Sequence, residues 1–339
     1  MTAINKPTVT IVSAGDTAKT VTLNANTIYM RGDSLTYASR NVIIVRNDMV
    51  AHGDSAFLDG RTDHETIRLM FKPKVQGTTG RKFELEGDIV DAYSKSKKLE
   101  RVVARGNARA TSRDLEITSD TIDLRMSNDY LEHAFAWSHP GLAKAKSPGQ
   151  SIVADSIDVT MPKQRVQVVR AFRRAFAQAD ADSTKFRTTE KDWLSGDTVV
   201  AWFDSAATTK DTNATPPLKQ ILATHVKDSA RAYYHLVATD TAAKVPAIGY
   251  VRGREIQLDF DDHKIGRIAV RDSVAGIYLE PRHDTASTTT KGKANAKPQT
   301  KPPTKPPTTT PPKKPPVELP EPRQRPDLAG GRPRDSFLS

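Results

Sequence analysis

The chain has 339 residues, of which 37% are hydrophobic and 6% aromatic, and it contains no cysteine. The missing cysteines exclude disulfides and thiolate metal sites, and no run of about 18 apolar residues offers a membrane-spanning helix. The net charge of +11 is concentrated at the C-terminus, where eleven Lys and Arg but only four acids follow residue 284. Because the rest of the chain carries only +4, nucleic-acid binding by a folded basic face is not expected.

Residues 1–20 are expected to form a lead-in to the folded body. They hold a short apolar stretch, but the charged segment and long apolar core of a signal peptide are not visible in them. The sequence begins almost inside a strand-like run, which indicates a truncated start. Export is therefore not predicted from these residues themselves.

Residues 21–280 contain an internal repeat in two parts. The first part is a strand-like run led by a small residue and an acid: SDTIDLRM (119–126), ADSIDVTM (154–161) and GDTVVAWF (196–203). The second part has apolar or small residues at offsets 3, 5, 9 and 11 from an apolar residue, while the residue at offset 7 varies. It begins at Leu99, Val166, Ile221 and Ile265. In ERVVARGNARA (100–110) one face is small or apolar and the other carries three arginines, which is typical of a half-buried strand.

Short turn-like segments such as SNDY (127–130) and PKQR (162–165) join the two parts, so each repeat is predicted to be a hairpin. The leading acids follow one another at intervals of 32, 35 and 42 residues. Such intervals hold two strands comfortably but are short for four-stranded propeller blades. No convincing helical periodicity occurs in the body. We therefore predict an all-β fold, an elongated stack of antiparallel hairpins that each add a rung to two sheets.

Residues 281–339 are expected to be a disordered, basic tail. More than half of the chain's 22 prolines lie between residues 298 and 333. Because proline fixes φ and lacks an N–H donor, this segment is predicted to be extended and without a core. It is interpreted as a solvated spacer, or as an arm that binds an acidic surface or spans a polymer layer.

Several segments resemble motifs of catalysis or ligand binding but lack residues that these motifs require. SAGDTAKT (13–20) lacks the glycines of a phosphate-binding loop, and DHE (63–65) and DFDDH (259–263) lack the spacing of a metal site. A Gly-x-Ser-x-Gly elbow is also missing from the sequence. The remaining candidates are the leading acids, Asp88, Asp120, Asp155 and Asp197. We interpret them as strand-entry turns in which Asp bonds its own backbone. The sequence thus predicts no enzymatic activity, no cofactor and no metal site.

The small inward residues raise the question of what fills the interior. A sandwich core normally interdigitates bulky side chains across about 10 Å, and recurring alanine would leave that space underfilled. The interior is then either a thin core filled by its own side chains or an apolar slot for acyl chains, whose burial is worth about 0.8 kcal/mol per methylene. An open stack also ends in unpaired strands, expected near residues 21–30 and 265–280, which invite pairing with another chain.

The units 99–126 and 150–179 resemble the OstA-like repeat, which consists of an acid-led strand, a turn and the motif Val-x-Ala-x-Gly-x-Val-x-Ala. The resemblance covers about residues 20–280 and is best over 83–178, where Gly106 occupies the motif glycine. This family comprises the periplasmic bridge proteins of lipopolysaccharide transport and the related N-terminal domain of the outer-membrane assembly protein.

The resemblance implies an open β-jelly-roll, or β-taco, whose interior shields the lipid A acyl chains of lipopolysaccharide on their way across the periplasm to the outer membrane. It implies a periplasmic, non-enzymatic protein that adds other OstA-like transport proteins, or further copies of itself, edge to edge, and binds no nucleic acid. Arg173 and Asp228 stand where the motif has glycine, which argues against an unbroken slot. The implied groove-lining residues are Leu85, Ile89, Val102, Ala104, Ala108, Ile122, Leu124, Ile157, Val159, Val169, Ala171 and Val199.

Two other interpretations stay open. A structural or surface β-solenoid scaffold, including a filament-forming one, needs only the repeats and the tail. A polysaccharide-acting β-solenoid enzyme would need a cluster of carboxylates on one wall of the stack. Capture of an acyl lipid at the inward positions distinguishes the transport interpretation from both.

Overall fold

The computed structural model describes residues 1–13, 16–32, 34–62, 64–79, 82–96, 98–113, 115–182, 187–203, 221–239, 245–261 and 264–281. The strands all lie in one unit, Met1–His283, and a second unit comprises Asp284–Ser339. The prediction of a disordered tail over 281–339 therefore falls almost entirely outside the described residues.

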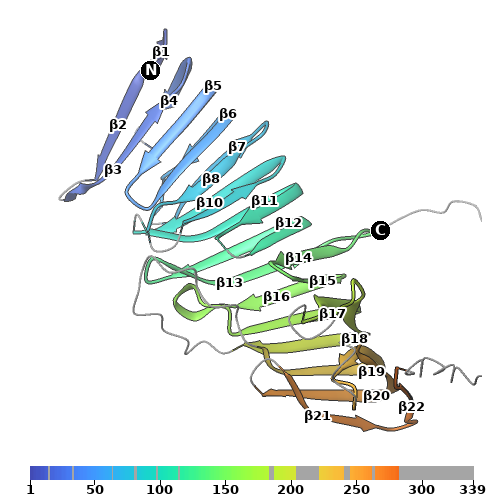
Figure 1. Cartoon of the computed structure of the whole chain (residues 1–339). Helices are drawn as coiled ribbons and strands as arrows, with labels where there is room; N and C mark the ends of the chain where they lie inside the picture. Colours follow the sequence, from blue (N-terminus) through green and yellow to red (C-terminus); the bar gives the residue numbers. More distant parts are fainter. Residues whose placement is uncertain are drawn as a thin grey trace, which may run out of the picture. The chain divides into compact units, whose positions relative to one another are not determined.

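The described residues form antiparallel strands and one short 3-10 turn, η1 (Pro162–Gln164). In chain order the strands are β1 (Thr2–Ile4), β2 (Thr8–Ser13), β3 (Asp16–Asn24), β4 (Thr27–Arg31), β5 (Leu35–Arg46), β6 (Met49–Asp59), β7 (His64–Met70), β8 (Lys74–Gly77), β9 (Phe83–Glu86), β10 (Ile89–Lys95), β11 (Lys98–Thr111), β12 (Glu116–Ser127), β13 (Tyr130–Trp137), β14 (Ala143–Ser147), β15 (Gln150–Ala154), β16 (Ser156–Thr160), β17 (Val168–Asp180), β18 (Lys191–Phe203), β19 (Ile221–Leu236), β20 (Ala247–Asp261), β21 (Lys264–Arg271) and β22 (Ala275–Leu279). They form one hydrogen-bonded sheet that advances along the stack in chain order, although many neighbours are not consecutive strands, as in the pairs β1–β4, β7–β10 and β13–β16 (Figure 1). The predicted all-β stack of antiparallel hairpins is confirmed.

The long strands turn a corner and thereby contribute to two walls. In β11, residues 101–105 pair with β10 and the second part of β12, whereas residues 108–111 pair with β9 and the first part of β12. We call the wall that holds residues 101–105 wall 1, and the wall that holds residues 108–111 wall 2. Wall 1 also contains β1, β4, β7, β10, β13, β16 and β21, and wall 2 also contains β2, β3, β8, β9, β14, β15 and β22. The inward side chains of both walls form one hydrophobic core.

Pairs of residues in the left-handed backbone region form the corners. These pairs are Arg40 and Asn41, Phe71 and Lys72, Gly106 and Asn107, Arg173 and Arg174, Asp228 and Ser229, and Asp272 and Ser273. At four of these pairs the strand register shifts, so two residues of one strand oppose one of the next, as in a β-bulge that bends its strand. The variable offset-7 position of the repeat is therefore the corner. Arg173 (φ 61°) and Asp228 (φ 54°) adopt the same left-handed backbone as Gly106 (φ 74°), so the series of corners continues without glycine.

Two of the four leading acids, Asp88 and Asp155, bond to the corner of another strand and not, as expected, to their own backbone. Asn107 Nδ2 donates to Asp88 Oδ2 (3.1 Å), and Arg174 Nε donates to Asp155 Oδ1 (2.6 Å). The backbone N–H of Asp88 also donates to the Gly106 carbonyl (2.9 Å). The expectation was wrong because it treated each repeat alone, whereas the left-handed corner of the adjacent strand presents donors at this position.

Arg101 and Arg105 of ERVVARGNARA lie on the outer face of wall 1, where they contact buried aspartates, whereas Arg109 lies on wall 2 and pairs with Glu116. Asp91 has no exposed side-chain surface and accepts hydrogen bonds from Arg68 Nε (2.7 Å) and from Arg105. Arg101 Nε donates to Asp123 Oδ1 (2.9 Å) in the same way. The ion pairs of this outer face therefore join neighbouring strands of the wall.

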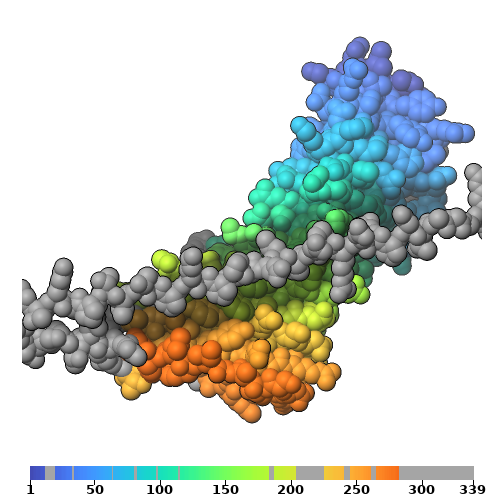
Figure 2. Space-filling model, turned by 90° about the vertical axis from the view of Figure 1, so that its right-hand side faces the viewer, coloured from blue at the N-terminus to red at the C-terminus, as the bar shows by residue number. Residues whose placement is uncertain are grey.

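The stack begins earlier in the chain than expected. Residues 1–20 form β1, β2 and the first part of β3, which pair within the same sheet. The threonine-rich, period-two pattern of this segment is that of a strand, so it is continuous with the repeat body. From this end the chain proceeds in sequence order to β22, as the succession of colours in Figure 2 shows.

Candidate functional site

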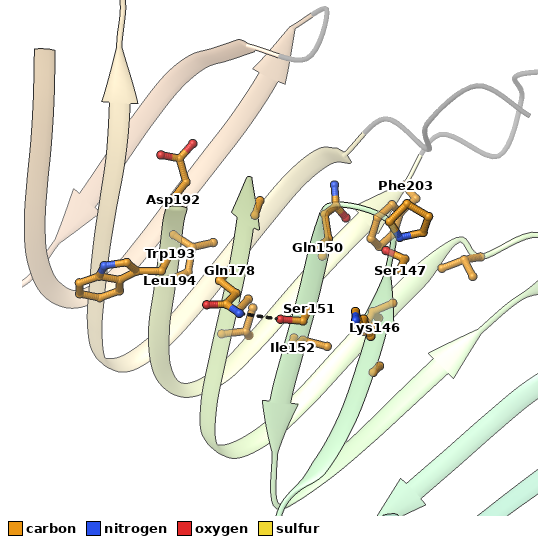
Figure 3. Close-up of a pocket in the computed structure, with 18 of the residues that line it drawn as sticks. Lys146, Ser147, Gln150, Ser151, Ile152, Gln178, Asp192, Trp193, Leu194 and Phe203 are labelled. Carbon is orange, nitrogen blue, oxygen red and sulfur yellow. Dashed lines mark hydrogen bonds between the residues drawn. The ribbon is translucent and has the colours of Figure 1, made fainter. Parts of the chain in front are cut away.

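A cavity of about 630 Å³ lies between the two walls in the C-terminal half of the stack, and Figure 3 shows it in close-up. Its lining is mainly apolar. Wall 1 and the turns at its free end contribute Val166, Val169, Val199, Ala201, Phe203, Leu258, Phe260 and Ile265. Wall 2 and the turns at its free end contribute Leu115, Ala145, Ile152, Ala177, Ala179, Leu194 and Tyr234. Cavities of this size and polarity are typical of sites for small apolar or amphiphilic molecules.

The cavity exists because small residues recur in the inward rows of both walls. In wall 2, Ala145 pairs with Ile152, and Ala177 lies between Ile152 and Leu194. In wall 1, Ala201 pairs with Val169. Since alternation turns all of these side chains inward, each alanine removes bulk from the space between the walls. The inward alanines of the two walls therefore leave space between the walls that another molecule can occupy.

Polar residues lie at the mouth of the cavity, at the ends of the wall 2 strands: Arg113, Ser147, Gln150 and Asp192. Lys146, Ser151 and Gln178 also belong to the lining, but alternation turns their side chains to the outer face of wall 2. Gln178 Nε2 donates to Ser151 Oγ at 3.0 Å, which joins β17 to β15 (Figure 3). An apolar interior with a polar mouth matches an amphiphile, whose chain avoids water and whose head group seeks it.

Asp192 is a partly buried acid at this mouth. Its Oδ1 accepts a hydrogen bond from the His235 backbone N–H (2.9 Å) and lies 2.7 Å from His235 Nδ1. Burial raises the pKa of the Asp192 carboxyl above its ordinary value, although the bonds and charge of His235 act in the opposite direction. Asp192 and His235 thus form a partly buried polar pair at this edge of the cavity.

An aromatic row on the outer face of wall 2, behind the cavity, was missed by the sequence reasoning. The ring centroids of Trp193 and Tyr233 are 6.0 Å apart with nearly parallel planes, and Phe176 lies 5.9 Å from Trp193. The Tyr233 hydroxyl donates to Glu190, and burial together with this acceptor raises the pKa of Tyr233 to about 12. The sequence did contain a signal for this row, because Trp193 and Tyr233 occupy directly opposite positions on the consecutive strands β18 and β19.

Most of the predicted groove-lining residues lie in the interior, but few of them line the cavity. Val169 and Val199 do line it. Nine others are buried in the core: Leu85, Val102, Ala104, Ala108, Ile122, Leu124, Ile157, Val159 and Ala171. Ile89 contradicts the prediction because it is 36% exposed on the outer face, opposite Arg105. Its neighbour Val90 is the inward residue, with no exposed surface. Contact of the eleven interior residues with lipid stays a prediction.

The core of the N-terminal half is filled by side chains. Leu23, Ile44, Met49, Leu69 and Leu85 have no accessible surface, so no space large enough for water touches them. The prediction of underfilling thus applies to the C-terminal half, where Ile152, Leu194 and Phe260 are only partly buried.

Within the described residues, no helix is long and apolar enough to cross a membrane. Nor do three His, Cys, Asp or Glu side chains of the described ranges gather as metal ligands do. A scan against models of known protein families found no match, and a search of curated proteins found none either. The resemblance to the OstA-like family therefore stays a prediction that rests on the repeat residues.

Proposed function

We propose that the cavity binds the acyl chains of a lipid, and that the protein carries lipopolysaccharide by shielding its lipid A chains between the two walls. The observation that carries this proposal is the apolar cavity of about 630 Å³ with a polar mouth. Transfer of a chain from water into such a site is worth about 0.8 kcal/mol per methylene, so ten methylenes supply roughly 8 kcal/mol before the cost of ordering the chain. The proposed role is non-enzymatic and lies in the periplasm.

The proposed partners are further OstA-like proteins or copies of this chain, added at the ends of the stack. Among the described residues, β22 pairs with β20 alone, and its Ile277 and Leu279 are 59% and 56% exposed. An apolar edge strand of this kind favours strand addition by another chain. The same edge supports the alternative function of a scaffold or filament, which would need the edges but not the cavity.

The test uses adjacent residues on opposite faces of β18. Phe203 lines the cavity, whereas Trp202 points outward and is 36% exposed. One variant keeps Trp202 as its sole tryptophan through Trp137→Phe and Trp193→Phe. The other adds Trp202→Phe and Phe203→Trp to that background. Both retain the full chain, and circular dichroism checks that both retain the β fold.

A brominated fatty acid quenches only tryptophans that its bromines contact. We expect strong, saturable quenching in the Phe203→Trp variant and little in the variant that keeps Trp202, with lipid A restoring the fluorescence. Equal quenching of both, or of neither, would contradict acyl binding between the walls. Quenching that a phospholipid reverses and lipid A does not would retain the lipid site but reject lipopolysaccharide as its cargo.

A further inference from the structure

The free ends of the two walls carry the hairpin turns, and we call these ends rim 1 and rim 2. The turn between β5 and β6, with Asp48, belongs to rim 2. The turn between β10 and β11 belongs to rim 1, with Ser94 and Leu99 on its two strands. Between these two rims runs the seam, the line along which the fold would open.

Two side chains bridge the seam over the N-terminal half. Arg46 Nη1 of wall 2 donates to Ser94 Oγ of wall 1 at 2.7 Å, and the Leu99 N–H donates to Asp48 Oδ2 at 2.8 Å. Arg46 Nη2 donates to the same Asp48 oxygen at 3.0 Å, so the two bridges form one unit. The Arg46 side chain is only 3% exposed and Asp48 12%. We call this set of residues the clasp.

A second contact crosses the seam closer to the cavity. Thr79 Oγ1, beyond the end of β8 in wall 2, donates to the Asp129 carbonyl in the turn between β12 and β13 of wall 1 at 3.3 Å. The cavity lining begins at the next turn along each rim, with Arg113 and Leu115 on rim 2 and Val166 on rim 1. The bridged part of the seam and the cavity therefore occupy different stretches of the stack.

The interior beneath the clasp is full. Met49 and Ala51 of wall 2 and Ala92 of wall 1 have no accessible surface. Because these three residues are fully enclosed by their neighbours, an acyl chain could reach them only if the walls separated. Separation would break the two hydrogen bonds that cross the seam, Arg46 to Ser94 and Leu99 to Asp48, whereas Arg46 would keep Asp48 as an acceptor on its own hairpin.

We infer that the clasp of Arg46, Asp48, Ser94 and Leu99 closes the N-terminal half of the stack, so the acyl-chain site is confined to the C-terminal half and is blind towards the N-terminus. The inference rests on the proposed function for the identity of the ligand. It narrows the ligand class to a small number of acyl chains, because about 630 Å³ is the size of a pocket for one small molecule. Loading and release then take place in the C-terminal half, and no chain passes through the N-terminal end.

The absence of cysteine in the sequence allows a direct test with single-cysteine variants of the full chain. Ala51→Cys and Ala92→Cys report on the clasped half, and Ala177→Cys and Ala201→Cys report on the cavity. All four begin from alanine, so the added bulk is the same. The rate of modification by a small thiosulfonate is measured by mass spectrometry, with and without a saturated fatty acid.

We expect modification at Ala177→Cys and Ala201→Cys to be at least tenfold faster than at the clasped positions, and to be suppressed by the fatty acid. Adding Asp48→Ala, or Arg46→Met, should raise the rate at Ala51→Cys and Ala92→Cys about tenfold and leave Ala177→Cys unchanged. Asp59→Ala is the matched control, because Asp59 pairs with Arg61 two residues away but within wall 1 alone. Circular dichroism identifies any variant that fails to fold, and Asp48→Asn then replaces Asp48→Ala.

The outcomes separate the inference from the proposed function. Fast modification of Ala51→Cys in the intact protein, suppressed by fatty acid, would overturn the clasp and retain lipid binding. No protection by fatty acid at any position would contradict the proposed function, while the contrast in rates without lipid would still decide whether the clasp closes its half.

Discussion

Asp91 shows how single residues hold wall 1 together. Burial alone would raise the pKa of its carboxyl, but hydrogen bonds from Arg68 and Arg105 and their charges outweigh burial and lower the pKa. A carboxyl with a lowered pKa stabilises the fold fully above its unfolded pKa of about 3.9, and this contribution is lost as pH falls through the folded value.

We therefore predict that Asp91→Asn lowers the free energy of unfolding at neutral pH by roughly 1–2 kcal/mol, a modest loss because both arginines are about half exposed and keep part of their hydration. Urea unfolding at several pH values tests this. The difference between the two proteins should be constant above about pH 5 and shrink below about pH 4. A difference that does not depend on pH would show that the charge of Asp91 does not matter.

At the same scale, residue type and position in the repeat predicted most inward side chains. Ile89 was assigned to the inward face. In the acid-led frame, however, the residue two after the acid faces inward: Ile122 follows Asp120, and Val90 follows Asp88. Register decides the face of a strand, so a one-residue error moves a side chain to the opposite side.

At the scale of the element, the corner explains why the repeat tolerates variation at offset 7. Left-handed backbone costs about 1 kcal/mol or more for a residue with a Cβ, yet Arg173 and Asp228 accept it. Gly106 differs because a Cβ there would overlap the Asp88 carboxylate, which accepts from Asn107. Glycine at this corner therefore serves close packing as well as backbone freedom.

This predicts different costs for two glycines that share the left-handed conformation. Gly106→Ala should lower the free energy of unfolding by about 2–3 kcal/mol, and Gly32→Ala, whose Cβ would meet nothing within 4 Å, by about 1 kcal/mol. Denaturant titration of both variants measures the difference. Equal costs would mean that the contact with Asp88 contributes nothing.

The strands and hairpins could be predicted because their signals are local: period-two alternation, turn residues and the acid that leads each rung. The corners could not, because they depend on register shifts between neighbouring strands. Asp88 and Asp155 were misassigned for the same reason, since their hydrogen-bond partners lie on another strand.

At the scale of the molecule, the ends of the stack determine assembly. If β22 adds strands, Ile277→Lys should suppress self-association, because an unpaired charge at an apolar edge opposes strand addition. Sedimentation velocity over a concentration series measures this. Val45→Lys is the control, since Val45 is 42% exposed but lies on β5, which is paired on both sides. An equal effect of both substitutions would point to general solubility rather than to the edge.

The position of the cavity could not be predicted from the repeats. Alanine and leucine alternate in both halves, but whether the walls leave room depends on which side chains meet across the interior. Leu85 and Met49 fill the N-terminal half, whereas Ala177 and Ala201 leave the C-terminal half open. Such pairings are set by the twist and register of the whole stack rather than by any one repeat.

The most direct test of acyl binding between the walls is a crystal structure of the full chain grown with a bromine-labelled fatty acid, in which anomalous scattering locates the bromine. Our account predicts a bromine peak inside the C-terminal half, among Leu194, Phe203 and Leu258. Peaks confined to the outer faces, or walls packed together without space for a chain, would contradict it.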